Sequence, residues 1–267
     1  MALHRIILAD DHPAFMEGVA LKLERETDLK IVGRAFNGQD AWDLIQDQVP
    51  DLVLIDMDMP ELTGLDVVRR VAAKNLDVKM LPLSGHADPE YVMGTLEAGA
   101  SGYVMKNESL STIVSAVKSV LSGGVYISPR VSQQIVTRRL HSHNRERAVE
   151  DSLDRLVAIG ITPRLLKVLR LVGKGDNNEE IGEKLYKSAH TIRNQVDRLK
   201  TLSGQRWRPA LVAWTWRIGV YDVDQREYED VWEENERIRK VHAQEAREEE
   251  EEAARVAAEK AASDQNS

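Results

Sequence analysis

Hydrophobic positions in the first half of the chain follow two alternating patterns. Residues 52–55 are four consecutive apolar residues rich in β-branched types, which predicts a strand buried on both faces. Before and after this run, other short apolar runs alternate with segments in which apolar residues recur at helical spacing. We expect strands at residues 5–9, 29–35, 52–56, 79–83 and 102–104, and helices at 13–24, 38–46, 64–74, 89–98 and 109–122. This alternation predicts a five-stranded parallel sheet covered by helices on both faces.

From residue 128 onward the pattern contains helices only. Residues 129–140 and 151–159 have helical spacing, and the polar stretch 141–147 between them predicts a linker. Thr162 and Pro163 suit the N-cap and first turn of the next helix, and Asn177 and Ser188 suit the caps of two more. Short helices joined by turns of a few residues predict a helix-turn-helix, which is followed by a fourth helix at 207–218.

The third helix of this group has an apolar face and a polar, basic face. Ile192, Val196 and Leu199 are expected to hold it on the domain. The residues expected to be exposed are Thr191, Arg193, Asn194, Arg198 and Lys200. A helix with a packed back and a polar front can enter a DNA major groove, where Arg and Asn suit guanine and adenine edges and Lys and Thr can also hold phosphate. These five residues are therefore the predicted contacts with double-stranded DNA.

Charge is distributed unevenly along the 267 residues, whose net charge is −8. Residues 161–220 carry a net charge of +7 and residues 221–267 a net charge of −9. A compact basic segment is the footprint expected of a nucleic-acid-binding module. The chain has no cysteine, which excludes disulfides, thiolate metal sites and cysteine nucleophiles. No apolar run approaches the ~20 residues of a membrane span, and no signal-peptide pattern precedes the first strand, so we expect a soluble, cytoplasmic protein without a membrane partner.

Polar side chains stand where four of the predicted strands end. Asp10 and Asp11 follow the first strand, Asp56 ends the third, Ser84 follows the fourth, and Lys106 lies just beyond the fifth. Parallel strands end at the same edge of a sheet, so we expect these groups to converge there. Taken alone, Asp56 could equally serve as a helix N-cap.

The expected group has a coherent chemistry. Three carboxylates repel one another unless a cation lies among them, and hard oxygen ligands with open positions suit Mg²⁺, which also binds phosphate oxygens. A lysine ammonium and a serine hydroxyl can stabilise a phosphoryl group in transfer. Asp56 is then the predicted nucleophile, which forms an acyl phosphate.

The first 127 residues resemble a response-regulator receiver domain. The matching motifs are ADDHP at 9–13, LIDMDMP at 54–60, LSG at 83–85 and GASGYVMK at 99–106. The resemblance implies a flavodoxin-like doubly wound fold and a Mg²⁺ site formed by Asp10, Asp11, Asp56 and the backbone carbonyl of Asp58. It further implies that Asp56 is the phospho-acceptor, Lys106 the phosphate-binding lysine, Ser84 the switch hydroxyl, and Tyr103 the aromatic that turns inward when Ser84 moves. As a hypothesis of our own, the acidic side chain of Asp58 alters the rate at which water attacks the acyl phosphate.

Residues 161–221 resemble the DNA-binding domain of NarL/LuxR (FixJ) regulators. The matching runs are ITPR at 161–164, VLRLV at 168–172, EIGEKL at 180–185, SAHTIRNQV at 188–196 and RIGV at 217–220. Gly182 stands where the family often has alanine, and weakens its helix by about 0.5–1 kcal/mol. Asp197 adds a negative charge to the recognition helix. Trp207, Trp214 and Trp216 are expected to be core or dimer contacts.

We therefore divide the chain into a receiver at 1–127, a helical linker at 128–160, a helix-turn-helix domain at 161–221, and a charged tail at 222–267 that is either helical or coiled-coil, or disordered. The tail has apolar residues at heptad-like positions and five consecutive glutamates at 248–252. Its first half is expected to form a short coiled coil and its second half a solvated helix. Typical members of the resembled family end near residue 221, so the tail is a dimer contact, an acidic competitor for the basic domain, a kinase-contact arm, or only a solvated extension.

The resemblance implies a two-component response regulator. A partner sensor histidine kinase phosphorylates Asp56, and phosphorylation controls transcription through dimerisation to a homodimer and promoter DNA binding. Such a protein is not an enzyme, because the receiver catalyses only its own phosphoryl transfer and dephosphorylation. One alternative is a regulator whose helix-turn-helix and tail act through protein–protein contacts. A second is a phosphatase-like α/β hydrolase that uses Asp56.

Overall fold

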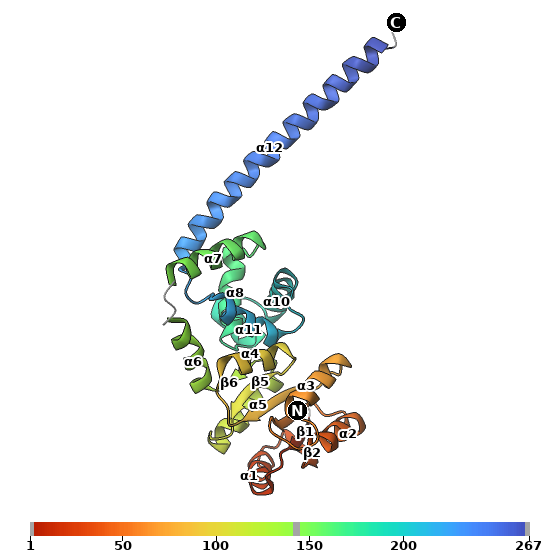
Figure 1. Ribbon diagram of the computed structural model, residues 1–267, viewed down its shortest axis with the longest axis vertical. Helices are drawn as coiled ribbons and strands as arrows, with labels where there is room; N and C mark the ends of the chain where they lie inside the picture. The colour runs from red at the N-terminus through yellow and green to blue at the C-terminus, as the bar shows by residue number, and fades with distance from the viewer. Residues whose placement is uncertain (1–2, 141–144, 265–267) are drawn as a thin grey trace.

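A parallel sheet forms the N-terminal part of the computed structural model, which describes residues 3–140 and 145–264 (Figure 1). Its strands are β1 (His4–Ala9), β2 (Leu29–Ala35), β3 (Leu52–Asp56), β4 (Lys79–Ser84), β5 (Gly102–Met105) and β6 (Tyr126–Ile127). They lie in the order β2-β1-β3-β4-β5-β6. The doubly wound parallel sheet is confirmed, but the predicted count of five strands was wrong by one. The additional strand, β6, has only two residues and pairs with β5, and two residues are too few to show a periodic pattern.

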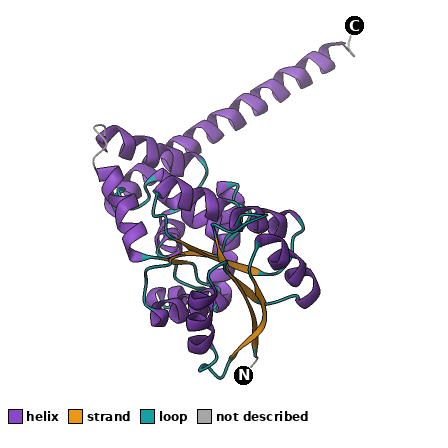
Figure 2. Cartoon of the chain, turned by 60° about the horizontal axis from the view of Figure 1, so that its bottom comes forward, coloured by secondary structure: helices purple, strands orange, loops and turns teal. Residues whose placement is uncertain are grey.

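Helices cover both faces of the sheet, as Figure 2 shows. They are α1 (Pro13–Leu23), α2 (Gly38–Gln48), α3 (Gly64–Ala73), α4 (Pro89–Glu97) and α5 (Leu110–Leu121). Successive side chains of a strand point to opposite faces. Ile6 and Leu8 of β1 therefore pack in one apolar cluster with residues of α1 and α5. Ile7 and Ala9 pack in a second cluster with residues of α2 and α3. Burial on both faces explains why β3 is apolar without alternation.

The C-terminal part is helical throughout the described residues. Its helices are α6 (Pro129–Leu140), α7 (Arg145–Ala158), α8 (Pro163–Gly173), α9 (Asn178–Leu185), α10 (Ala189–Ser203), α11 (Arg208–Ile218) and α12 (Gln225–Asp264). The predicted caps Thr162, Asn177 and Ser188 each accept a hydrogen bond from the backbone N–H three residues later. The predicted linker at 141–147 is partly helical, since α7 begins at Arg145, and its residues 141–144 lie outside the described residues.

The structure explains why glycine occupies position 182, although glycine lowers helix propensity. A Cβ atom at this position would lie 2.6 Å from the backbone carbonyl oxygen of Lys187. The amide of Lys187 in turn donates a hydrogen bond to the Gly182 carbonyl at 2.8 Å. Glycine therefore permits the close approach of α9 to the turn before α10, and the small loss of helix propensity is offset by a tight helix-turn-helix.

The two halves share an apolar cluster. Val92, Met93 and Leu96 of α4 belong to the same cluster as the buried residues of α8, α10 and α11. Helix α11 lies against α4, and the guanidinium of Arg217 pairs with Glu97 at 2.9 Å. The helix-turn-helix thus packs on the α4 side of the sheet.

Helix α12 begins in this cluster and then leaves the body of the molecule (Figure 1). Its 40 residues correspond to a length of about 60 Å. The predicted helical character of the tail is confirmed, whereas its pairing in a coiled coil stays a prediction. Within the described ranges, no helix combines the length and the hydropathy that crossing a lipid bilayer requires.

Candidate functional site

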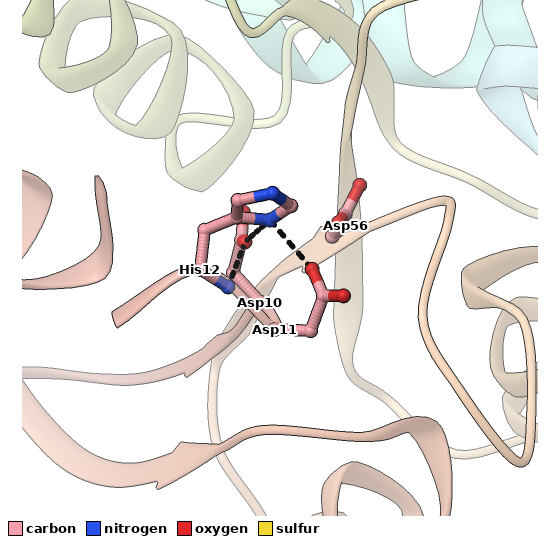
Figure 3. Close-up of side chains that lie close together, drawn as sticks. All are labelled: Asp10, Asp11, His12 and Asp56. Carbon is pink, nitrogen blue, oxygen red and sulfur yellow. Dashed lines mark hydrogen bonds and ion pairs between the residues drawn. The ribbon is translucent and has the colours of Figure 1, made fainter. Parts of the chain in front are cut away.

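The predicted strand-end residues meet at one edge of the sheet. Strand pairing places Ile55 beside Ala9, Asp56 beside Leu83, and Ser84 beside Met105. The residues that end or follow these strands, which are Asp10, Asp11, Asp56, Ser84 and Lys106, therefore lie at the same edge. Figure 3 shows Asp10, Asp11 and His12 grouped together, with Asp56 facing them from the neighbouring strand.

Lys106 links the two buried carboxylates of this group. Its Nζ lies 2.6 Å from Oδ2 of Asp56 and 3.0 Å from Oδ2 of Asp10. Asp56 is only 1% exposed and Asp10 only 2% exposed. The other oxygen of Asp56, Oδ1, accepts a hydrogen bond from the Asp58 amide at 3.2 Å. The ammonium and the two carboxylates thus form one charged unit at the end of an apolar sheet.

The electrostatics of the site follow from this burial. Burial raises the pKa of the Asp56 carboxyl above its ordinary value of 3.8, and the charge of Asp10 acts in the same direction. Burial works to lower the pKa of Lys106, but its interactions with Asp56 and Asp10 outweigh burial and raise that pKa above 10.5. The carboxylate form of Asp56 is therefore costly to maintain, and additional positive charge at the site favours it.

The side chains at this edge fit a divalent cation. Ligand atoms of Asp10, Asp11, His12 and Asp56 all lie within 4.8 Å of one another. Oδ2 of Asp10 and Oδ2 of Asp56 are buried, and the Lys106 ammonium lies within ion-pair distance of both. Several carboxylate oxygens this close together are suitable ligands for a hard cation such as Mg²⁺.

His12 is a member of this group that the sequence analysis did not assign. Its Nδ1 lies 2.6 Å from Oδ1 of Asp11 and 3.3 Å from Oδ1 of Asp10. Its backbone amide donates a hydrogen bond to Oδ1 of Asp10 at 2.9 Å. The position of His12 directly after Asp10 and Asp11 was the feature of the sequence that could have predicted its place in this group.

Ser84 and Tyr103 are both fully buried and both contact the backbone of His86, so the Tyr103 ring already lies inward and its predicted inward turn is not needed to reach this position. The Ser84 Oγ accepts a hydrogen bond from the His86 amide at 3.0 Å. The Tyr103 hydroxyl donates a hydrogen bond to the His86 carbonyl oxygen at 2.9 Å. Burial raises the pKa of Tyr103 well above its ordinary range, so this hydroxyl remains a donor. His86 also lies near the mouth of the site, with Nε2 3.5 Å from Oδ2 of Asp58.

The predicted DNA-contacting face is largely exposed. Helix α10 buries Ile192, Val196 and Leu199, as predicted. Its exposed residues include Thr191, Arg193, Asn194 and Arg198. Lys200 is less exposed than predicted, with a side chain that is 28% exposed and an Nζ that pairs with Asp197 of the preceding turn at 2.7 Å, and its phosphate contact stays a prediction. This i,i+3 ion pair offsets the negative charge that Asp197 adds to the recognition helix.

The three tryptophans join the packing of the C-terminal part. Trp214 is buried in the apolar cluster, and the indole of Trp216 donates a hydrogen bond to the Gly173 carbonyl at 3.0 Å. Trp207 instead contacts α4, where its indole donates a hydrogen bond to the Leu96 carbonyl.

Comparisons with known proteins agree with this geometry. The family model described as the response regulator receiver domain matches residues 6–118. The chain is 35% identical to the transcriptional regulatory protein DegU of Brevibacillus brevis, over 73% of this chain and 85% of DegU. It is 33% identical to the transcriptional regulatory protein LnrK of Bacillus subtilis (strain 168), over 81% of this chain and 98% of LnrK. Among solved structures, it is similar to a two-component response regulator of the LuxR family from Aurantimonas sp. SI85-9A1, with 30% identity, a TM-score of 0.50, and coverage of 52% of this chain and 100% of that one.

Proposed function

Because the chain belongs to the two-component response regulators of the NarL/LuxR type, we propose that Asp56 accepts a phosphoryl group from a partner sensor histidine kinase and that this event controls transcription through residues 161–221. The observation that carries the proposal is the buried Asp56 carboxylate with the Lys106 ammonium 2.6 Å away. A carboxylate at a strand end, next to a cation, is suited to attack a phosphorus atom in line with its leaving group.

In the proposed reaction, a carboxylate oxygen of Asp56 forms a bond to the phosphorus of a phosphohistidine. The P–N bond breaks, and the imidazole takes the electron pair and then a proton from water. Lys106 stabilises the charge on the phosphoryl oxygens, as an ammonium does in other phosphoryl transfers. Asp10, Asp11, Asp56 and the Asp58 carbonyl would hold Mg²⁺, which would supply positive charge to the acidic group and to the phosphoryl oxygens.

The phosphoryl group gives Ser84 a new acceptor. We infer that the Ser84 hydroxyl turns toward it and that the His86 backbone moves, because the amide of His86 donates to Ser84. Tyr103 follows, since its hydroxyl is bound to the His86 carbonyl. Tyr103 shares an apolar cluster with α4 and the helix-turn-helix, so a change at this point reaches the packing of α4 on α11.

The output step of the proposal is promoter binding by a homodimer. The exposed face of α10 supports it, because Arg193, Asn194 and Arg198 have the side chains that read base edges. The receiver packs on α11 and leaves the polar face of α10 exposed. This arrangement supports dimerisation, rather than uncovering of α10, as the regulated step.

The test of the first step uses the full-length chain, Mg²⁺ and a small phosphoryl donor such as acetyl phosphate. We expect one acid-labile phosphate per chain, with none in Asp56→Asn and normal labelling in the surface control Asp47→Asn. Repeated turnover of the donor without a labelled chain would instead indicate a hydrolase.

The test of the second step measures duplex binding and mass in solution with and without the donor. A protein that contacts phosphates loses affinity steeply as salt rises. We expect phosphorylation to increase both the dimer fraction and duplex affinity. No duplex binding even at low salt would favour an output through protein contacts.

A further inference from the structure

An open groove separates the recognition helix α10 from the first turns of α12. Its volume is about 1090 Å³. Thr191, Asn194 and Arg198 line one wall, and Glu233, Arg237 and Lys240 line the other. Three of the residues predicted to contact DNA therefore line one wall of a groove, and helix α12 of the C-terminal extension forms its other wall.

The position of this second wall is fixed by contacts at the base of α12. Tyr228 is fully buried, and its hydroxyl donates a hydrogen bond to the Ile161 carbonyl. Arg239 donates from Nη2 to the Val157 carbonyl at 3.2 Å, which ties α12 to α7. Because α8 and α10 pack in the same apolar cluster as Tyr228, the base of α12 keeps a fixed place relative to the recognition helix.

The chemistry of the lining favours a polyanion. The cations of the groove are Arg164, Lys167, Arg198, Arg237 and Lys240, and its acids are Glu229, Glu233 and Glu236. Glu229 pairs with Lys167, which also belongs to the lining, at 3.5 Å, and Glu236 pairs with Arg239, which lies outside the lining, at 3.4 Å. Small-molecule pockets are lined mostly by hydrophobic and aromatic side chains, and this groove is not. Its excess of positive charge and its continuity with the α10 face fit the sugar-phosphate backbone of a duplex.

We propose that α12 is the second wall of the DNA-binding groove, and that Arg237 and Lys240 contact phosphates flanking the bases that α10 reads. This inference rests on the proposed function, namely that residues 161–221 bind duplex DNA. Arg237 and Lys240 are three residues apart on a helix and so are neighbours on one face. Arg237 also pairs with Glu234 at 3.3 Å, a contact that a phosphate replaces on binding. Glu233 lies on the same wall and opposes binding.

The experiment measures binding of the phosphorylated full-length chain to a fluorescent mixed-sequence duplex of about 30 base pairs, which spans several helical turns. Anisotropy is recorded between about 50 and 200 mM salt. We expect the double variant Arg237→Gln/Lys240→Gln to bind about tenfold more weakly, with a salt slope reduced by about 1.8, because each phosphate contact contributes about 0.9. Glu233→Gln is expected to bind severalfold more tightly.

Matched controls separate local contacts from net charge. Arg25→Gln/Lys30→Gln removes one Arg and one Lys from the exposed surface of the receiver, and Glu227→Gln removes one exposed acid from α12 outside the groove lining. Each control is expected to change affinity less than twofold. Equal effects of the groove and control variants would overturn the proposal, since they would indicate a long-range charge effect. No effect of the groove variants, while Arg193→Ala still weakens binding, would also overturn it and leave the proposed function intact. If Arg193→Ala has no effect either, the proposed function itself fails.

Discussion

The indole Nε1 of Trp207 donates a hydrogen bond to the backbone carbonyl of Leu96 at 3.2 Å. Leu96 belongs to α4 and Trp207 precedes α11, so this bond connects the receiver to the helix-turn-helix. Arg217 strengthens the same contact through Glu97. The receiver and the helix-turn-helix are thus in direct contact through α4 and α11, in addition to their connection through the linker.

Removal of the Trp207 ring should loosen this contact. We expect Trp207→Ala to lower the free energy of unfolding by about 2 kcal/mol, less than the cost of deleting a fully buried Trp, because the side chain is half-buried. Hydrogen exchange should speed up in α4 and α11, and less so in Trp207→Phe, which keeps the ring contact. Unchanged protection of both helices would show that the interface does not depend on Trp207.

Asp56 should make stability depend on pH in a defined direction. Its pKa is raised in the folded chain, so the folded state binds the proton more tightly than the unfolded state. The stability contribution of Asp56 is therefore favourable at acid pH and is lost as pH rises from its ordinary value of 3.8 through the folded value. Without Mg²⁺, Asp56→Asn should have a larger free energy of unfolding than the wild type at neutral pH. This difference should vanish below pH 3.8, the ordinary pKa of an aspartate. Thermal unfolding of both proteins between acid and neutral pH tests this prediction. The same stability difference between them at all pH values would contradict it.

Addition of Mg²⁺ should stabilise the folded chain through the acidic group. A ligand at a hundred times its Kd adds about 2.7 kcal/mol to the free energy of unfolding. We expect Asp11→Asn to weaken Mg²⁺ binding by at least about tenfold, since even partners outside the ligand set change metal affinity by this amount. Calorimetric titration measures the affinity, with Asp47→Asn as the surface control. Equal affinities in the two variants would place the metal elsewhere.

The Asp58 carboxylate should accelerate loss of the phosphate from Asp56. It stands at the mouth of the site, 3.5 Å from Nε2 of His86, where it can accept a proton from an attacking water. The decay of acid-labile label after removal of the donor should be severalfold slower in Asp58→Asn. Asp47→Asn again serves as the control, and an unchanged decay rate in Asp58→Asn would remove this role.

The amino-acid sequence alone was sufficient to predict the alternating strands and helices and the convergence of Asp10, Asp56, Ser84 and Lys106. This succeeded because hydrophobic periodicity reflects burial, and because parallel strands necessarily end at one edge of their sheet. The helix caps of the second domain were equally predictable, since capping depends on residues a few positions apart.

Other features depend on contacts between residues far apart in the chain, and only the tertiary structure decided them. The two-residue strand β6 exists because β5 offers it a partner. Gly182 is explained by a neighbouring turn, and the contact between Trp207 and Leu96 joins residues 111 positions apart. The groove between α10 and α12 likewise arises where Tyr228 anchors the extension beneath Ile161. Local sequence patterns record which face of an element is buried, but not which distant element buries it.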